Sequence, residues 1–250
     1  MDSDGLKPMA ETSTTGALNN PNANFVAVPD AAKLEALAEF AAGAGHEINN
    51  PLATIIGRAQ LLLKEERDPQ RRQMLMSIGA QAYRIRDMIG DTMLFGRPPR
   101  PELSNANLAE IVQKVIAKQA NDLANEHCSV SVDIDKSIIL RADTAQLSIV
   151  FHELVRNSRQ ALQPNGGKIE ISAAIESGLA LIQLVDQGNG FTDLEREHAF
   201  DPFFSGRQAG RGLGFGLPKC WRIIQQHQGQ IEIQSSPTGP TTVQIIWPVA

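Results

Sequence analysis

Residues 43–52 read Gly-Ala-Gly-His-Glu-Ile-Asn-Asn-Pro-Leu, and this stretch decides how the N-terminal third of the chain folds. It lies in a longer segment whose apolar residues recur at steps of three and four, the spacing that gives a helix one buried face. These residues are Leu34, Leu37, Ala41, Ala44, Ile48, Leu52, Ile55, Ala59 and Leu62. His46 follows Ala44 by two positions, which rotates it by about 200° from that face. The pattern therefore predicts a helix that exposes an imidazole, whose neutral form has a nucleophilic ring nitrogen.

A second amphipathic segment follows a turn at Asp68-Pro69. It repeats the same spacing with Leu75, Ile78, Ala82, Ile85 and Ile89. We expect residues 31–96 to form a helical hairpin whose first helix spans residues 31–66. One hairpin leaves each apolar face half covered, so two hairpins should pair into a four-helix bundle. The sequence thus predicts a homodimer.

The pattern changes after the hairpin. Gly96-Arg97-Pro98-Pro99-Arg100-Pro101 predicts a stiff linker over residues 97–103, because proline fixes φ and lacks an N–H. The remaining residues, 104–250, combine strand-like and helical segments. Helices are expected over 107–125, 143–162 and 214–227, and strands over 129–134, 138–141, 168–176, 179–186, 230–235 and 241–247. This order favours an α+β fold, an α/β sandwich with helices on one face of a mixed sheet.

Composition sets limits on function. Residues 1–30 are polar and lack apolar periodicity, so we expect a disordered tail. The formal net charge is −5 with no dense basic run, which argues against a nucleic-acid partner. We find no membrane span and no signal pattern, and we therefore expect a cytoplasmic protein. Cys128 and Cys220 form no disulfide or metal framework.

Polar residues share one face of the helix expected over 143–162. Glu153, Asn157 and Gln160 stand at i, i+4 and i+7. A solvated face is the plainer interpretation. The functional one gives an oxygen of Asn157 to Mg²⁺ and lets Glu153 hold a metal-bound water, because Mg²⁺ takes hard oxygen ligands, retains waters and bridges phosphates.

The stretch Val-Asp-Gln-Gly-Asn-Gly-Phe, residues 185–191, follows a strand-like run. A carboxylate at the strand end, here Asp186, can accept a hydrogen bond from an exocyclic amine such as that of adenine. Gly188 and Gly190 allow a sharp turn and a close approach to a flat ligand. An ordinary turn is the alternative.

A glycine-rich stretch follows Phe200-Asp-Pro-Phe-Phe204. It places Gly210, Gly212, Gly214 and Gly216 ahead of the helix that contains Leu217. Backbone N–H groups of such a loop favour a phosphate, although the spacing matches neither a Walker A loop nor a dinucleotide fingerprint. A flexible lid is the alternative. The order of the three stretches within one domain, downstream of an exposed histidine, favours a nucleotide site.

Over residues 33–248 the chain resembles the core of two-component sensor histidine kinases. The similarity rests on five boxes: the phosphoacceptor box at 46–52, the asparagine box at 152–162, the first glycine box at 186–191, the phenylalanine box at 201–204 and the second glycine box at 212–217. The resemblance implies a Bergerat-type ATP-binding domain behind a dimerising hairpin.

The resemblance also implies cofactors and roles. ATP and Mg²⁺ would bind, with Asn157 as the metal ligand. His46 would accept the γ-phosphoryl group, Glu47 would act on its other ring proton, and Asn50 would orient water during dephosphorylation of the regulator. The implied nucleotide-binding residues are Glu153, Asn157, Gln160, Asp186, Gly188, Gly190, Phe203, Phe204, Arg207, Gly212, Leu213, Gly214, Phe215, Gly216 and Leu217. Arg207 stands where many relatives have lysine, and it keeps the cation.

The implied partner is the receiver domain of a separate response regulator, whose aspartate takes the phosphoryl group. Residues 1–30 are too polar and too short for an input domain, so we expect the input from a separate sensor protein or through the N-terminal end of the first helix. The alternatives are a protein that is chiefly a response-regulator phosphatase, a dimerising pseudokinase scaffold, and an ATP-driven clamp of the same superfamily. The presence of His46 and Asn157 disfavours the scaffold, and a clamp has no need of a hairpin histidine.

Overall fold

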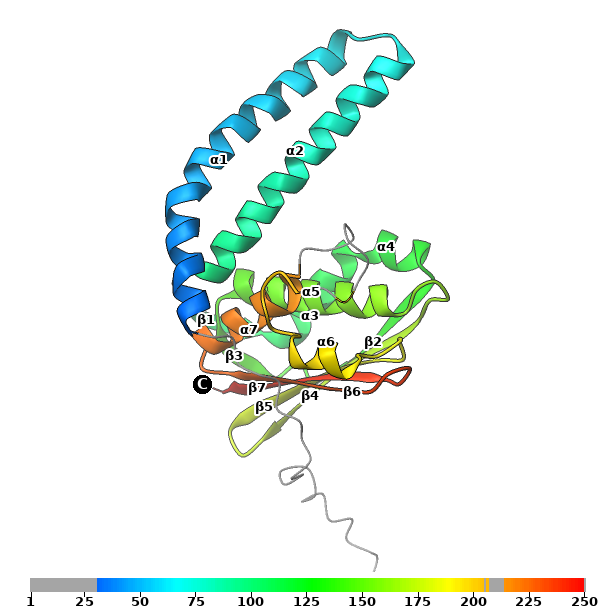
Figure 1. The fold of residues 1–250 in the computed structure, drawn as a ribbon. Coiled ribbons are helices and arrows are strands. Elements are labelled where there is room, and N and C mark those ends of the chain that lie inside the picture. The colour runs from blue at the N-terminus through cyan, green and yellow to red at the C-terminus, as the bar shows by residue number, and fades with distance from the viewer. Residues whose placement is uncertain (1–30, 205, 207–213, 250) are drawn as a thin grey trace, which may run out of the picture.

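The computed structural model describes residues 31–204, 206 and 214–249, and for residues 31–35, 38, 41, 42, 44 and 46 it describes the backbone alone. The described chain forms a long helical hairpin that stands on an α/β domain (Figure 1). This architecture confirms the predicted order of a hairpin followed by an α/β sandwich. The tail expected over residues 1–30 lies outside the described residues.

The hairpin consists of α1 (Ala31–Glu65) and α2 (Pro69–Gly96). The turn between them is stabilised by Asp68, whose carboxylate accepts a hydrogen bond from the Arg71 N–H at 2.9 Å. Pro69 occupies the first turn of α2, where its missing N–H costs nothing. Although these helices are 35 and 28 residues long, no helix in the described part of the chain is long and apolar enough to cross a membrane.

The α/β domain contains a five-stranded sheet in the order β2-β4-β5-β7-β6. β2 pairs in parallel with β4, and the other neighbours pair antiparallel, so the sheet is mixed as predicted. The strands are β2 (Cys128–Ile134), β4 (Gly167–Glu176), β5 (Leu179–Asp186), β6 (Gln230–Ser235) and β7 (Thr241–Pro248). The register aligns Asp186, at the end of β5, with Thr241 at the start of β7.

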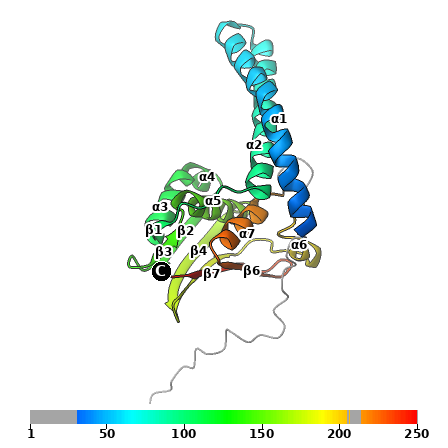
Figure 2. The same ribbon diagram turned by 90° about the vertical axis from the view of Figure 1, so that its left-hand side faces the viewer.

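Helices cover one face of this sheet (Figures 1 and 2). They are α3 (Leu108–Lys118), α4 (Ala120–Asn125), α5 (Thr144–Ala161) and α7 (Gly216–Gln226). The core between the two layers contains fully buried side chains from both, among them Leu147, Phe151, Ile171, Ile182 and Trp247. α5 lies centrally in the helical layer and carries the asparagine box. Its inner face is buried in the core, which holds the helix on the sheet.

Three details differ from the sequence prediction. The helix expected over 107–125 is broken at Gln119, because the buried Gln119 side chain turns inward and donates to the His152 carbonyl oxygen at 3.3 Å. β1 (Ser104–Asn107) was not expected; it pairs with β3 (Ile139–Ala142) in a separate two-stranded sheet. A short helix that was also not expected, α6 (Asp193–Glu197), begins with a capping box.

Candidate functional site

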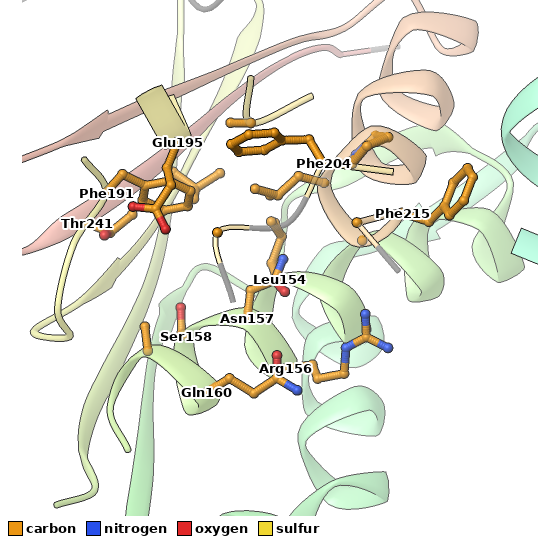
Figure 3. Close-up of a pocket in the computed structure, with 18 of the residues that line it drawn as sticks. Leu154, Arg156, Asn157, Ser158, Gln160, Phe191, Glu195, Phe204, Phe215 and Thr241 are labelled. Carbon is orange, nitrogen blue, oxygen red and sulfur yellow. The ribbon is translucent and has the colours of Figure 1, made fainter. Parts of the chain in front are cut away.

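A cavity of about 1220 Å³ lies between α2 and the α/β domain. Side chains from α5, from the end of β5 and from the start of α7 reach it, and Figure 3 shows Asn157 and Gln160 on α5 across from Phe191 and Thr241. Nine of the predicted binding residues line it: Asn157, Gln160, Asp186, Gly190, Phe204, Gly214, Phe215, Gly216 and Leu217. Residues far apart in the sequence therefore converge on one cavity.

Asp186 closes the inner end of the cavity from β5. It is only 3% exposed, and its carboxylate accepts hydrogen bonds from the Ser158 hydroxyl at 2.6 Å and from the Gly188 N–H at 3.0 Å. Burial raises the pKa of Asp186, and the two hydrogen bonds only partly offset this effect. The result is an oriented acceptor at the base of the cavity.

The loop after Asp186 is held by protein contacts on both sides. The Asn189 N–H donates to the carbonyl of Ala161 at 3.2 Å, and its own carbonyl accepts from the Thr238 N–H at 2.8 Å. Gly190 has φ +66°, and a Cβ there would lie 1.9 Å from the Ser236 carbonyl oxygen. Glycine is therefore required at position 190 because the loop packs against the β6–β7 turn. This reason is independent of the close approach to a ligand that the sequence analysis expected of Gly190.

The start of α7 forms the opposite wall of the cavity. Gly214 has φ +70°, and a Cβ there would collide with the Phe204 carbonyl oxygen. Gly216 begins the helix beside the Asn157 side chain of α5, so the second glycine box meets the asparagine box. The N-cap residue Phe215 has no polar side chain and makes no capping bond, so within the described residues no N-cap side chain competes with a bound anion for the first N–H groups of α7.

Glu153 lies one turn before Asn157 on α5, but its side chain contacts α7 and does not line the cavity. It is 4% exposed, and its carboxylate pairs with Lys219 of α7 at 2.8 Å and with Arg156. Among the described residues, Glu153, Gly188 and Phe203 are predicted binding residues that do not line the cavity. Phe203 packs on Phe215 with ring centroids 4.8 Å apart. Arg207, Gly212 and Leu213 lie outside the described residues.

The hairpin motif lies on α1. His46 is in this helix, but its side chain is not among those described. Glu47 and Asn50 are exposed. Neighbouring Gly45 faces Met93 of α2 so closely that a Cβ would meet the Met93 sulfur, which fixes the level of the motif against α2. Of the predicted hairpin residues whose side chains are described, Glu47 and Asn50, neither lines the cavity.

The side chains of the cavity fit a metal ion that binds together with phosphates better than one held by protein side chains alone. In the described residues no group of three or more His, Cys, Asp or Glu side chains could hold a metal ion. Mg²⁺ needs few protein ligands when phosphates and waters supply the rest. The Asn157 side chain lines the cavity and offers one such oxygen.

Three residues that the sequence analysis passed over contribute to the site. The Ser158 hydroxyl donates a hydrogen bond to the Asp186 carboxylate. Thr241 on β7 stands opposite Asp186 in the strand register and lines the cavity. Only the strand register reveals Thr241. Lys219 had a signal in the sequence, because it is a cation within a helix whose neighbours Cys220, Ile223 and Ile224 are apolar.

Comparison with known proteins defines the class of the two domains. Residues 36–100 match the family described as "His Kinase A (phospho-acceptor) domain". Residues 142–250 match "Histidine kinase-, DNA gyrase B-, and HSP90-like ATPase". A phosphoacceptor domain therefore precedes an ATP-binding domain.

Individual relatives share this pair of domains. Sporulation kinase C of Bacillus subtilis (strain 168) is 30% identical over 224 residues, which are 87% of this chain and 50% of that protein. Sensory histidine kinase/phosphatase NtrB of Salmonella typhimurium (strain LT2) is 32% identical over 218 residues, 83% of this chain and 61% of that protein. The chain thus spans about half the length of these curated relatives.

The fold has counterparts among solved structures. A crystal structure of full-length ShkA in complex with AMPPNP matches with a TM-score of 0.75 and 18% identity, over 85% of this chain and 46% of that one. The chain is a two-component sensor histidine kinase core, as its motifs predicted.

Proposed function

We propose that this chain is an ATP-dependent protein-histidine kinase. It transfers the γ-phosphoryl group of ATP to His46 and then to an aspartate of a separate response-regulator receiver domain. The observation that supports this most strongly is the shared wall formed by α2. One side of α2 lines the candidate nucleotide cavity, and the same helix packs along α1, which carries the phosphoacceptor motif.

In this proposal different residues of the cavity bind different groups of ATP. Asp186 accepts a hydrogen bond from the adenine amine, and the open N–H groups at the start of α7 bind phosphate oxygens. The Asn157 oxygen would hold Mg²⁺, which when bound would offset charge on the phosphoryl group that is transferred. Gln160 and Phe204 complete the walls of the cavity around the nucleotide.

His46 is the acceptor in this proposal. A neutral ring nitrogen forms the new N–P bond while the bond from the γ-phosphorus to the β–γ bridging oxygen breaks, and ADP leaves with that electron pair. Glu47, the next residue along α1, holds or takes the proton on the other ring nitrogen. General acid–base assistance of this kind contributes about 100- to 10,000-fold in rate.

The hairpin has a surface for a second copy of the chain. One hairpin leaves the large apolar side chains Ile55, Leu61, Leu62, Met74, Met76, Ile78 and Ile85 exposed. Pairing with a second hairpin covers such a surface in a four-helix bundle. We therefore infer a homodimer. A separate sensor protein, or the N-terminal end of α1, supplies the input.

A second activity has its own support. Glu47 and Asn50 lie one turn apart on α1 and are both exposed, so a receiver domain can reach both. The relative NtrB carries the description kinase/phosphatase. Removal of phosphate from the regulator, with Asn50 orienting the attacking water, is the alternative function.

Labelling with γ-labelled ATP and Mg²⁺ tests the kinase. We expect acid-labile, alkali-stable label on the wild type and none on His46→Gln or Asn157→Ala. Asn125→Ala, at the exposed end of α4, is the matched control and keeps the label. Label that persists on His46→Gln rules out this acceptor. Label that persists on Asn157→Ala rules out the role of that side chain.

A further inference from the structure

Lys219 is a buried cation that joins the two domains. It lies on α7 with 5% of its surface exposed. Its Nζ donates to the Glu153 carboxylate of α5 at 2.8 Å and to the Asp91 carboxylate of α2 at 2.7 Å. One ammonium group therefore connects the pocket helix, the glycine-box helix and the hairpin.

The surroundings of Lys219 explain why it stays charged. Burial alone would lower the pKa of Lys219, but the two carboxylates outweigh burial and raise it. Glu153 has a second cation, Arg156, whereas the Asp91 side chain is 30% exposed and can be hydrated when it separates. The bond to Asp91 is thus the one that can open without leaving a buried carboxylate unpaired.

Asp91 stands close to the level of the phosphoacceptor motif. Met93, two residues after Asp91, packs directly against Gly45, which precedes His46. Two residues of helix span about 3 Å. The Lys219–Asp91 contact therefore lies within about one helical turn of the level of His46 along the hairpin.

An aromatic contact lies beside this ion pair. Phe95, at the end of α2, is fully buried, and its ring centroid lies 6.0 Å from that of Phe215 in an edge-to-face arrangement. Phe215 is the residue before α7 and lines the cavity. The aromatic pair adds apolar contact between α2 and the start of α7, and the charge-assisted hydrogen bond from Lys219 to Asp91 specifies the position of α7 on α2 more narrowly.

We propose that Lys219 is a positioning residue, which through Asp91 fixes the nucleotide cavity on α2 near the level of His46. This consequence for phosphoryl transfer rests on the proposed kinase function. The positioning itself does not, because it concerns only where the ATP-binding domain sits on the hairpin. Phosphoryl transfer gains from such fixed placement, since a small misplacement of reacting groups is costly in rate.

Pulsed electron resonance distances between spin labels test the positioning. Labels at Gln73 on α2 and Glu176 at the end of β4 report on the two domains in a Cys128→Ser background, with excess unlabelled chain so that measured pairs lie within one chain. Gln73 and Glu176 are exposed, and Cys220 is buried. We expect a narrow distance distribution in this background and a broadened one in Asp91→Ala. Alanine keeps the helix, and Lys219 keeps its bond to Glu153.

Two further variants separate the ion pair from other effects. Asp87→Ala removes an acid one turn away on α2, whose carboxylate pairs with exposed Arg86, and should leave the distribution narrow. Lys219→Met should broaden it, and the double variant with Asp91→Ala should be no broader than Lys219→Met. A narrow distribution in Asp91→Ala, or equal broadening in Asp87→Ala, overturns the proposal.

Kinetics then test the consequence. Asp91→Ala should lower kcat for autophosphorylation by about 10- to 100-fold. The KM for ATP should stay within about twofold, because Asp91 lines the α2 wall of the cavity but is bonded to Lys219 through its carboxylate and is not one of the predicted nucleotide-binding residues. An unchanged or raised kcat overturns the positioning role. If the wild type takes no label at all, the proposed kinase function fails while the distance result still stands.

Discussion

The hairpin and the α/β domain bury their apolar residues in different ways. In the α/β domain one continuous cluster joins both layers and includes the fully buried Phe151, Leu147 and Trp247. The cluster within the hairpin consists of Leu52, Ile56 and Ala82, with Ile48 and Tyr83 packed against it. The α/β domain is therefore stabilised within one chain, whereas the hairpin depends on further contacts.

This difference matches what each region has to do. A nucleotide cavity needs rigid walls, and α5 supplies one because its inner face is fully packed. In the proposed function the hairpin instead offers side chains to a second hairpin and to a receiver domain, and in the described chain apolar and polar groups of the hairpin are accessible. α2 belongs to both regions, because it forms half of the hairpin and one wall of the cavity.

The same substitution placed in each region is the strongest test of the comparison. Leu147→Ala, in the core under α5, should lower the free energy of unfolding by about 4 kcal/mol, because a packed core cannot collapse into the space. Leu52→Ala in the hairpin should cost about 2 kcal/mol, because its small cluster can relax. Urea unfolding followed by circular dichroism measures both. Equal losses would contradict the distinction between the regions.

A charge on the uncovered hairpin surface should break the dimer. Ile85 is 43% exposed in one chain. Ile85→Glu should weaken dimerisation by about 10- to 100-fold, because the pairing would bury an unpartnered carboxylate. Sedimentation equilibrium measures the change, and Gln73→Glu on another face of α2 is the control. A dimer unaffected by Ile85→Glu means that this surface is not the interface.

A substitution of Asp186 in the cavity should weaken nucleotide binding and leave dimerisation unchanged. Asp186→Asn should weaken ATP binding by about 10-fold or more, because the amide cannot replace both the Ser158-bonded oxygen and the acceptor for adenine. Calorimetric titration measures the affinity, with exposed Asp193→Asn as the control. Unchanged affinity would remove Asp186 from the site.

Two helix caps provide the smallest and most closely matched comparison. Asp143 caps α5 and accepts from the N–H groups of Ala145, Gln146 and Glu102, whereas Asp68 accepts from Arg71 at the start of α2. Asp143→Ala should cost about 2 kcal/mol of unfolding free energy and Asp68→Ala about 0.5 kcal/mol. Thermal unfolding of the full chain measures both losses. A larger loss for Asp68→Ala would contradict the ranking.

The contribution of Asp143 should also depend on pH. Burial raises its pKa, but the backbone hydrogen bonds outweigh burial, and the pKa of Asp143 is lowered in the folded chain. The stabilisation is therefore complete above the ordinary aspartate value of 3.8 and is lost as the pH falls below that value. The difference between wild type and Asp143→Ala should shrink over that range.

Local patterns predicted most of the fold. Periodicity placed the helices and strands because α5 and β5 bury a regular face. The strand β1 escaped prediction because its sequence, Ser-Asn-Ala-Asn, has no apolar alternation and depends on pairing with β3. The break in the helix at Gln119 was not predicted for a similar reason, because it depends on a hydrogen bond from the Gln119 side chain to a carbonyl oxygen 33 residues away.

Motifs that carry their own chemistry predicted residues of the candidate site. Asn157 and Asp186 were identified from their boxes, and both line the cavity. The pairing of Glu153 with Lys219 was not predicted, because Lys219 stands 66 residues away in the sequence. The contact of Lys219 with Asp91 depends on how two domains meet, which no local spacing encodes.

Mapping of the phosphorylated residue tests the central claim most directly. The intact chain is incubated with ATP and Mg²⁺, digested at neutral to alkaline pH and analysed by mass spectrometry, because a phosphorus–nitrogen bond on imidazole does not survive acid. The account predicts the added phosphate on the peptide that contains His46, at that residue. Phosphate on any other residue, or none at a saturating ATP concentration, would contradict it.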